Sequence, residues 1–191
     1  MEKRNGDKKA CGGRRFDPGR RARILESTLE VIAEHGVGQT TLRMVAERAD
    51  VPLGSMTYHF AGRDALLIEA FTNFSTEMTT IFEARFDGVT SKEDARAAIV
   101  EHICGESESW GSKRNLLLSY EMYAFTSRTD LSRAILRKWV DSVRAQLEKY
   151  FDRRTADALD ALIEGYSIHR SVDVGAFKRE DIEATILLVS S

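Results

Sequence analysis

The sequence predicts an all-α protein of about nine helices. Apolar residues recur at intervals of three and four along most of the chain, which is the spacing of amphipathic helices, and no segment alternates like a convincing strand. Only 2 of the 191 residues are proline, and 42% are hydrophobic. A chain of this length can bury a substantial core in one or two domains.

The first helix is expected over residues 20–35, where apolar residues form one stripe. Gly36 follows, and glycine is the residue type that most readily provides a left-handed helix cap. Arg20, Arg21 and Arg23 lie at the start of this helix, where they could meet a phosphate group.

Residues 40–60 predict two short helices that meet at a tight corner. Thr40 or Thr41 can cap the first, because a threonine oxygen accepts a hydrogen bond from an unpaired backbone N–H. Asp50 tolerates the left-handed backbone of a sharp corner, and Pro52 suits the first position of the second helix. Such a pair is a helix-turn-helix, whose second helix enters the major groove of DNA.

The second helix of the pair would turn Met56 inward and present small, hydroxyl-bearing and ring side chains outward. Hydroxyl groups there can reach base edges or phosphates, and an apolar Leu53 suits a thymine methyl group. His59 would bond to a phosphate or, alternatively, only pack at the end of the helix. The residues expected to contact DNA are Thr41, Arg43, Pro52, Leu53, Ser55, Thr57, Tyr58 and His59.

Residues 58–67, with the sequence YHFAGRDALL, complete a pattern that resembles the TetR family of one-component transcriptional regulators. The resemblance is close over residues 20–70 and rests on architecture beyond them. Pro52 and Leu53 replace the family's usual hydroxyl and polar or basic residues, and Thr57 replaces a frequent tyrosine. These changes do not affect the implied fold, but they put the family's base contacts in doubt.

Composition and the resemblance together divide the chain into three parts. Residues 1–19 are basic and glycine-rich, and they form either a flexible arm on the DNA or a dispensable tail. Residues 20–66 would form the helix-turn-helix DNA-binding domain, and residues 67–191 a helical ligand-binding and dimerisation domain. In the family, a fourth helix links the two domains and its tilt transmits the ligand signal.

That fourth helix is expected from Arg63 to about Phe86, where apolar residues recur at helical spacing. A break at residues 87–90 precedes a capping box at residues 91–94, which opens a fifth helix that reaches Cys104. Four more helices are expected at about residues 116–127, 130–150, 155–170 and 180–189, the third of them capped by Thr155.

The second domain contains aromatic and apolar side chains with a few polar tips, which suit a small-molecule pocket. In a helical bundle most such residues are simply core, so this alternative stays open. The candidate ligand-binding residues are Phe74, Met78, Phe82, His102, Trp110, Tyr120, Tyr123 and Trp139.

A dimer interface is implied for the last two helices, which in the resembled family pair with their copies in a second chain. Small residues (Ala158, Ala161 and Gly165) would let another backbone approach closely. The alternative is a helix packed inside its own chain. The expected interface residues are Leu159, Leu162, Ile163, Tyr166, Ile182 and Ile186.

Charge is unevenly divided along the chain. Residues 1–63 carry 12 Lys and Arg against 8 Asp and Glu, and the remainder carries 16 against 22. A basic front end fits contact with phosphate, although an ordinary uneven surface would look the same. No apolar run suits a membrane span or a signal peptide. The only two cysteines, Cys11 and Cys104, suggest a reducing compartment, so we expect a cytoplasmic protein.

No nucleophile motif, phosphate-cradling glycine loop or convincing catalytic cluster is evident. Glu101, His102, Cys104 and Glu106 can each bind a metal, but adjacent and i+2 positions on a helix point apart. We therefore expect no enzymatic activity, no metal and no cofactor.

The sequence thus predicts a sequence-specific transcriptional regulator. It would be a ligand-responsive repressor that binds a pseudo-palindromic operator in double-stranded DNA as a homodimer, with an unknown small molecule as effector. One alternative is a regulator that activates or is not ligand-controlled. Another is a dimeric helical ligand-binding module whose head no longer reads DNA.

Overall fold

The computed structural model describes residues 17–105, 112–128, 130–173 and 177–191. Over these ranges the chain forms nine α-helices and no strand, which confirms the predicted fold class. Most of the predicted arm, and Trp110 of the predicted pocket, lie outside the described ranges. Within them, no helix combines the length and the apolar character needed to cross a lipid bilayer.

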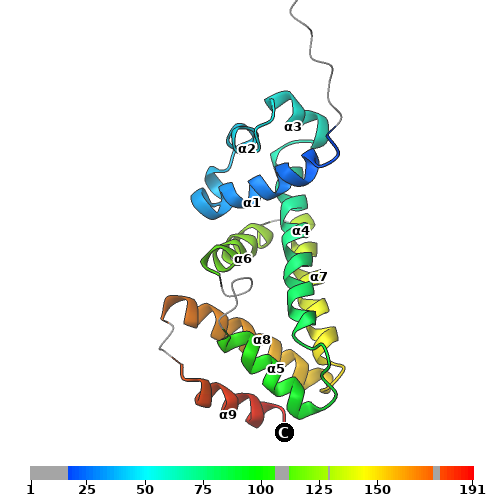
Figure 1. Cartoon of the computed structure of the whole chain (residues 1–191), viewed down its shortest axis with the longest axis vertical. Coiled ribbons are helices and arrows are strands. Elements are labelled where there is room, and N and C mark those ends of the chain that lie inside the picture. Colours follow the sequence, from blue (N-terminus) through cyan, green and yellow to red (C-terminus); the bar gives the residue numbers. More distant parts are fainter. Residues whose placement is uncertain (1–16, 106–111, 129, 174–176) are drawn as a thin grey trace, which may run out of the picture.

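Three helices form one end of the molecule, which we call the head (Figure 1). They are α1 (Arg20–Gln39), α2 (Leu42–Arg48) and α3 (Leu53–His59). Gly36 adopts φ 75° and ψ 159° inside α1, so it kinks the helix instead of ending it as predicted. After the kink, α1 continues to Gln39.

The corner between α2 and α3 has the predicted geometry, with one correction. The Thr41 side chain caps α2 by accepting from the Met44 N–H at 3.2 Å. Asp50 adopts φ 51° at the turn, and Met56 is fully buried beneath α3. Pro52 is extended and precedes α3 as its N-cap, so it is not the first helical residue.

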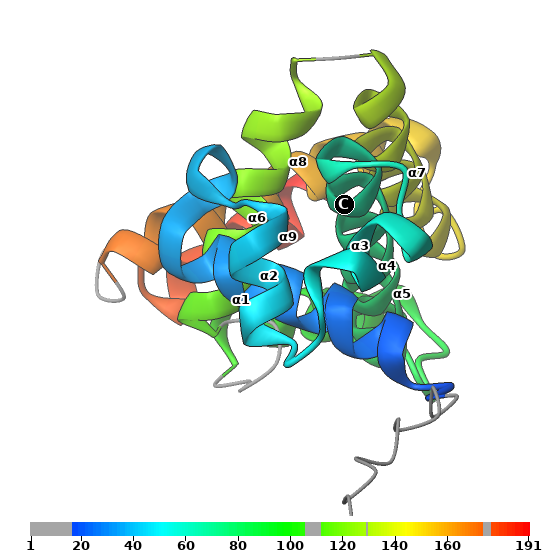
Figure 2. The same ribbon diagram turned by 90° about the horizontal axis from the view of Figure 1, so that it is seen from above.

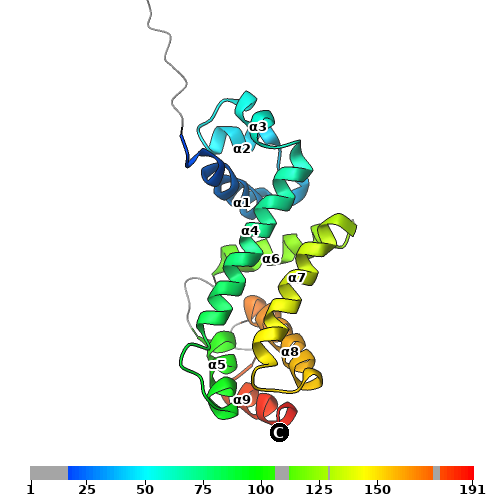
Figure 3. The same ribbon diagram turned by 90° about the vertical axis from the view of Figure 1, so that its right-hand side faces the viewer.

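α4 (Arg63–Ala84) runs from the head into the rest of the molecule, which we call the body. α7 (Asp130–Leu147) lies beside it, and α6 (Lys113–Thr126) crosses between α1 and the far end of the body (Figure 3). Buried aromatic residues such as Phe71 and Phe74 fill the inner face of α4. Burying each of these rings stabilises the fold by about 1.5–3 kcal/mol.

The far end of the body contains α5 (Lys92–Cys104), α8 (Arg153–Val172) and α9 (Arg179–Val189). Ser91 caps α5 as predicted, accepting from the Asp94 N–H at 3.0 Å. α8 begins three residues earlier than predicted: Asp152, and not Thr155, is its cap. The predicted cap residue had the right chemistry, but an acidic side chain was available one turn earlier.

One continuous core joins the head and the body. Its buried members include Ile24 in α1, Val45 in α2, Leu67 in α4 and Trp139 in α7. Protein cores are close-packed and resist small displacements. A shift of α4 in the body would therefore displace the residues that pack against it in the head.

Candidate nucleic-acid interface and effector site

α3 turns one side into the head and leaves the other side exposed. Tyr58 is 84% and Leu53 is 51% exposed, whereas Met56 is fully buried. Thr57 is also exposed, and its hydroxyl donates to the Gly54 carbonyl oxygen at 3.1 Å. In Figure 2, which views the molecule from the head end, α2 and α3 lie in front of the body helices. This side of α3 is therefore open to a partner.

The other predicted DNA contacts lie around the same end of the head. Thr41, Arg43 and Pro52 are exposed, while Ser55 and His59 are partly buried. Arg43 pairs with Glu47 at 2.9 Å, but both side chains are largely exposed. Such a pair contributes little free energy in water, so the Arg43 guanidinium is free to exchange this carboxylate for a phosphate.

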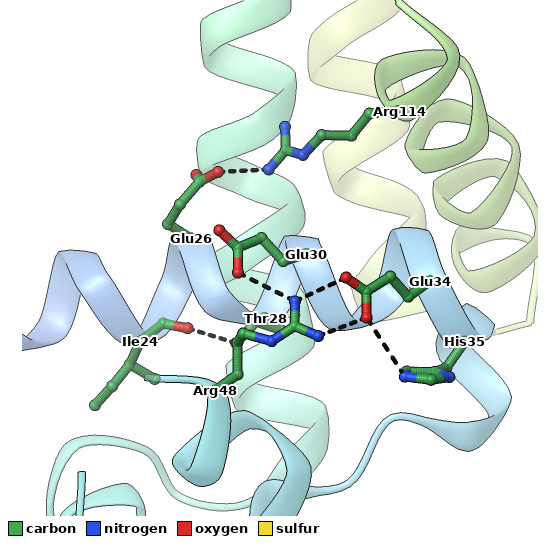
Figure 4. Close-up of polar contacts among 8 residues, drawn as sticks. All are labelled: Ile24, Glu26, Thr28, Glu30, Glu34, His35, Arg48 and Arg114. Atoms are coloured by element: carbon green, nitrogen blue, oxygen red, sulfur yellow. Dashed lines mark hydrogen bonds and ion pairs between the residues drawn. The ribbon is translucent and has the colours of Figure 1, made fainter. Parts of the chain in front are cut away.

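A network of charged side chains fixes α2 against α1 (Figure 4). Arg48 donates to Glu34 at 2.5 Å and to Glu30 at 3.2 Å. The hydrogen bond from Arg48 holds the pKa of the Glu34 carboxyl below its ordinary value, and the charges of Arg48 and His35 act in the same direction. Arg48 thus joins α2 to two successive turns of α1 through partly exposed ion pairs, which contribute little free energy.

The arginines at the start of α1 do not face open solvent as free cations. Arg20 and Arg23 lie 3.8 and 2.9 Å from Asp17, and Arg21 lies 2.5 Å from Glu69 of α4. Their predicted phosphate contacts would have to replace these pairs. The pair of Arg21 with Glu69 could not be predicted from the sequence, because its two members are 48 residues apart.

Side chains of two other helices, α4 and α6, form hydrogen bonds with the backbone next to the kink in α1. Arg63, in the first turn of α4, donates to the carbonyl oxygens of Val37 and, at 2.7 Å, of Thr40. The N–H of Val37 donates to the Glu121 carboxylate of α6 at 2.8 Å. Buried backbone N–H groups need an acceptor, and next to the Gly36 kink α6 supplies it.

A second contact ties α6 to the same helix. Arg114 of α6 donates to Glu26 of α1 at 2.5 Å (Figure 4). Sequence reasoning missed Arg63, Arg114 and Glu121, since a single charge on a helix face predicts no particular partner. Together they make the contact between head and body partly polar and directional.

A family model for bacterial regulatory proteins of the tetR family matches residues 24–70, the part that contains the corner and the exposed α3. The crystal structure of SCO7518, a candidate transcriptional regulator from Streptomyces coelicolor A3(2), is 37% identical with a TM-score of 0.82. The alignment covers 91% of this chain and 99% of that one. This chain belongs to the TetR family. It is a DNA-binding transcriptional regulator and not an enzyme.

Other TetR-family similarities extend into the body. The regulator BetI of Escherichia coli O157:H7 is 24% identical over 159 residues, which cover 76% of this chain and 79% of that protein. BetI 1 of Chromohalobacter salexigens is 31% identical over 87 residues, but this alignment spans only 45% of this chain and 43% of that one. The multidrug-binding protein EbrR, in its complex with ethidium, is 27% identical with a TM-score of 0.76, over 90% of this chain and 99% of EbrR.

The predicted ligand-binding residues of this TetR protein fall into separate groups. Phe74, Met78 and Phe82 are buried in the inner face of α4. His102 is buried edge-on to Phe82, with ring centroids 4.9 Å apart. Burial and, secondarily, the nearby Arg85 charge lower the pKa of His102 to about 3. These four residues form part of the core rather than an open pocket.

A second group lies where α6, α7 and α8 meet. Tyr123 and Trp139 have ring centroids 6.1 Å apart, and Tyr123 lies beside the Glu164 carboxyl of α8. Burial, together with the charge of Asp160, raises the pKa of Glu164 to about 7. Tyr120 of α6 forms a 2.5 Å hydrogen bond with Ser171 of α8. Sequence reasoning missed Glu164, because its position on the helix gave no indication of a partly buried carboxyl beside Tyr123.

An open groove of about 720 Å³ lies between the end of α4, α5 and α9, away from both groups. None of the predicted ligand-binding residues lines it. Two of the three arginines that line it have partners inside the chain: Arg179 donates to Glu101 and Arg96 to Ser190, both at 2.7 Å. The groove therefore does not coincide with the predicted pocket.

The predicted dimer residues are mostly inside their own chain, which corrects that assignment. Leu162 and Tyr166 are partly buried, and the Tyr166 ring packs edge-on against Phe177. A side chain that is already buried has no surface left for a second chain. Four of the six predicted residues are buried in this way: Leu159, Ile163, Ile182 and Ile186.

The structure also shows where most of the metal-capable residues of the sequence analysis lie. His102 and Cys104 lie on α5, with His102 turned into the core. Glu106 lies outside the described residues. Across the part of the chain that is described, no three His, Cys, Asp or Glu side chains gather as metal ligands would.

Proposed function

We propose that this TetR-family protein is a ligand-responsive repressor that acts in the cytoplasm and binds a pseudo-palindromic operator as a homodimer. Residues 20–66 would form its DNA-binding domain and residues 67–191 its ligand-binding and dimerisation domain. The observation that carries the proposal is the continuity of α4, which begins next to α3 and ends in the body core. A change in the body can thus alter the position of α3.

Dimerisation through α8 and α9 is supported by apolar residues that the chain leaves exposed. Val172 is 87% and Leu188 is 79% exposed, and exposed apolar patches mark interaction surfaces. A Cβ added at Gly165 would meet no atom within 4 Å, so the glycine leaves room for a partner backbone. The fitting occupant is a second copy, because a two-fold interface pairs the same surface with itself. The proposed interface residues are Ala161, Gly165, Ile168, Val172, Leu187 and Leu188.

We infer that the effector is an organic cation that binds between α6, α7 and α8. EbrR has been crystallised with ethidium, malachite green and proflavin, all of which are aromatic cations. Here Glu164 supplies a carboxyl group beside Tyr123, whose ring lies close to that of Trp139. A carboxylate pairs with a cation, and the faces of tyrosine and tryptophan attract one.

The same position suggests how the effector would act. Trp139 is 2% exposed and packs close to Tyr123, so a bound dye must part α6 from α7. α6 is hydrogen-bonded to α1 through Glu121 and Arg114. Moving it would strain these contacts and reorient the head. The effector must favour that arrangement by its own differential affinity.

The proposal is tested by adding cations to a complex with a selected operator fragment. Tetraphenylphosphonium is a suitable probe, because its non-planar rings do not intercalate, and neutral triphenylphosphine oxide is the matched control. We expect the cation, and not the control, to weaken operator binding, and Glu164→Gln to abolish the effect without changing operator affinity. If neither compound weakens binding, the effector class is wrong; if no operator is found, the repressor assignment is wrong.

A further inference from the structure

The guanidinium group of Arg21 links three helices: α1, on which it lies, α3 and α4. Arg21, in the first turn of α1, donates through Nε and Nη2 to the two carboxylate oxygens of Glu69 in α4, at 2.8 and 2.5 Å. Its Nη1 donates to the His59 carbonyl oxygen, at the last residue of α3, at 2.9 Å. The recognition helix, α1 and α4 therefore meet at this side chain.

The chemistry of each contact suits an arginine. The last carbonyls of a helix lack intrahelical partners and form the negative end of its dipole, so a cation at the His59 carbonyl stabilises the end of α3. The paired contact with Glu69 uses the planar fork of the guanidinium, which a lysine lacks. The guanidinium carbon also lies 4.8 Å from the ring centre of Phe60, which is buried directly after α3.

Arg23 makes a parallel contact on the other side of α1. Its Nε donates to the Ala49 carbonyl oxygen, just after the last residue of α2, at 3.1 Å. Residues two apart on a helix point in different directions, so α1 reaches the C-terminal ends of both helices of the helix-turn-helix. Only Arg21 also connects to α4.

Glu69 makes a direct phosphate contact by Arg21 unfavourable. The carboxylate already neutralises the guanidinium at hydrogen-bond distance, and a DNA phosphate would have to displace it. A role in aligning α3 with α4 uses every contact that the side chain makes. A phosphate-binding role, which the sequence suggested, uses none of them.

We propose that Arg21, held by Glu69, is a positioning residue for sequence reading: it fixes the recognition helix against α4 and does not bind DNA itself. Base contacts depend on the position of α3, whereas non-specific binding depends on charge. Loss of the clamp therefore weakens operator binding and leaves non-specific binding unchanged. The proposal needs only the DNA-binding activity of the family and does not depend on the effector or on repression.

The test compares Arg21→Lys, Arg21→Gln and Glu69→Gln in the full chain, by titration of a selected operator and of a scrambled duplex at several salt concentrations. We expect each variant to lose operator affinity by about tenfold, the size of one lost charge-assisted hydrogen bond. Affinity for the scrambled duplex and the slope of log affinity against log salt should stay at wild-type values.

A phosphate contact would give the opposite pattern. Arg21→Lys would then bind like wild type, Arg21→Gln would lose affinity for both duplexes with a slope reduced by about 0.9, and Glu69→Gln would bind more tightly. Either of the first two results overturns the proposal. Hydrogen exchange without DNA provides a second measurement: the amides of α3 should exchange faster in Arg21→Lys while those of α6 do not, and unchanged α3 exchange contradicts the proposal.

Discussion

Two ionisable groups in the body, the buried His102 and the partly buried Glu164, should oppose each other in the pH dependence of stability. His102 has a pKa lowered from 6.5 to about 3, first by burial and then by the Arg85 charge. The unfolded chain therefore takes up a proton as the pH falls below about 6.5, while the folded chain does not. This linkage removes about 1.7 kcal/mol from the free energy of unfolding between pH 6.5 and pH 5.0.

Glu164 acts in the other direction. Burial, with a contribution from Asp160, raises its pKa from 4.5 to about 7. The folded chain takes up this proton first, so the stabilisation is complete below about pH 4.5 and is lost as the pH rises through 7. Between pH 6.5 and pH 5.0 it adds about 1.7 kcal/mol. The two effects nearly cancel, and these two groups together should leave wild-type stability almost flat over this range.

Urea denaturation at the two pH values, at one fixed protomer concentration, measures the free energy of unfolding directly. We expect His102→Gln to become more stable by about 1.7 kcal/mol on going from pH 6.5 to pH 5.0, and Glu164→Gln to become less stable by about the same amount. His35→Gln, the same change at an exposed site, is the control and should follow wild type. If both buried-site variants also followed wild type, the reasoning would be refuted.

Other predictions concern the DNA-binding surface, the dimer and the junctions of α6. Tyr58→Ala should weaken operator binding in a gel-shift titration and leave the dimer intact by sedimentation; unchanged binding would contradict the assignment of α3. Leu188→Glu should yield folded monomers by sedimentation, whereas Leu117→Glu, at another exposed apolar position, should remain dimeric. Glu121→Ala should lower the free energy of unfolding by about 1–2 kcal/mol, because a buried N–H loses its acceptor, and Glu121→Gln should lose less; equal losses would contradict this role. Ethidium binding without DNA should strengthen about tenfold from pH 6 to pH 8 as Glu164, whose pKa is about 7, ionises, and a flat fluorescence titration would place the cation elsewhere.

The sequence was most informative where structure is set locally. The helical repeat, the cap at Thr41, the left-handed Asp50 and the inward Met56 depend on residues a few positions apart. These features sufficed to predict the all-α fold and the corner between α2 and α3. Small errors at Gly36 and Pro52 arose because neighbouring residues offered alternative helix ends.

The candidate sites were harder to predict because they depend on contacts between distant segments. The pairs of Arg21 with Glu69 and of Val37 with Glu121 join residues 48 and 84 positions apart. Nothing in the local sequence distinguishes these charges from ordinary solvated ones. Four of the predicted dimer residues were misplaced for a related reason: an apolar stripe on a helix looks the same in the sequence whether it packs inside its own chain, as at Leu159, or faces outward.

The most direct test of the account is to select bound fragments from genomic DNA and then titrate the enriched sequence at two salt concentrations. We expect an inverted repeat whose half-sites are about one helical turn, or a multiple of it, apart. Two chains, or a multiple of two, should bind each site with affinity that falls steeply with salt. A folded dimer that enriches no sequence, and binds all duplexes alike, would contradict the claim that the exposed face of α3 reads an operator.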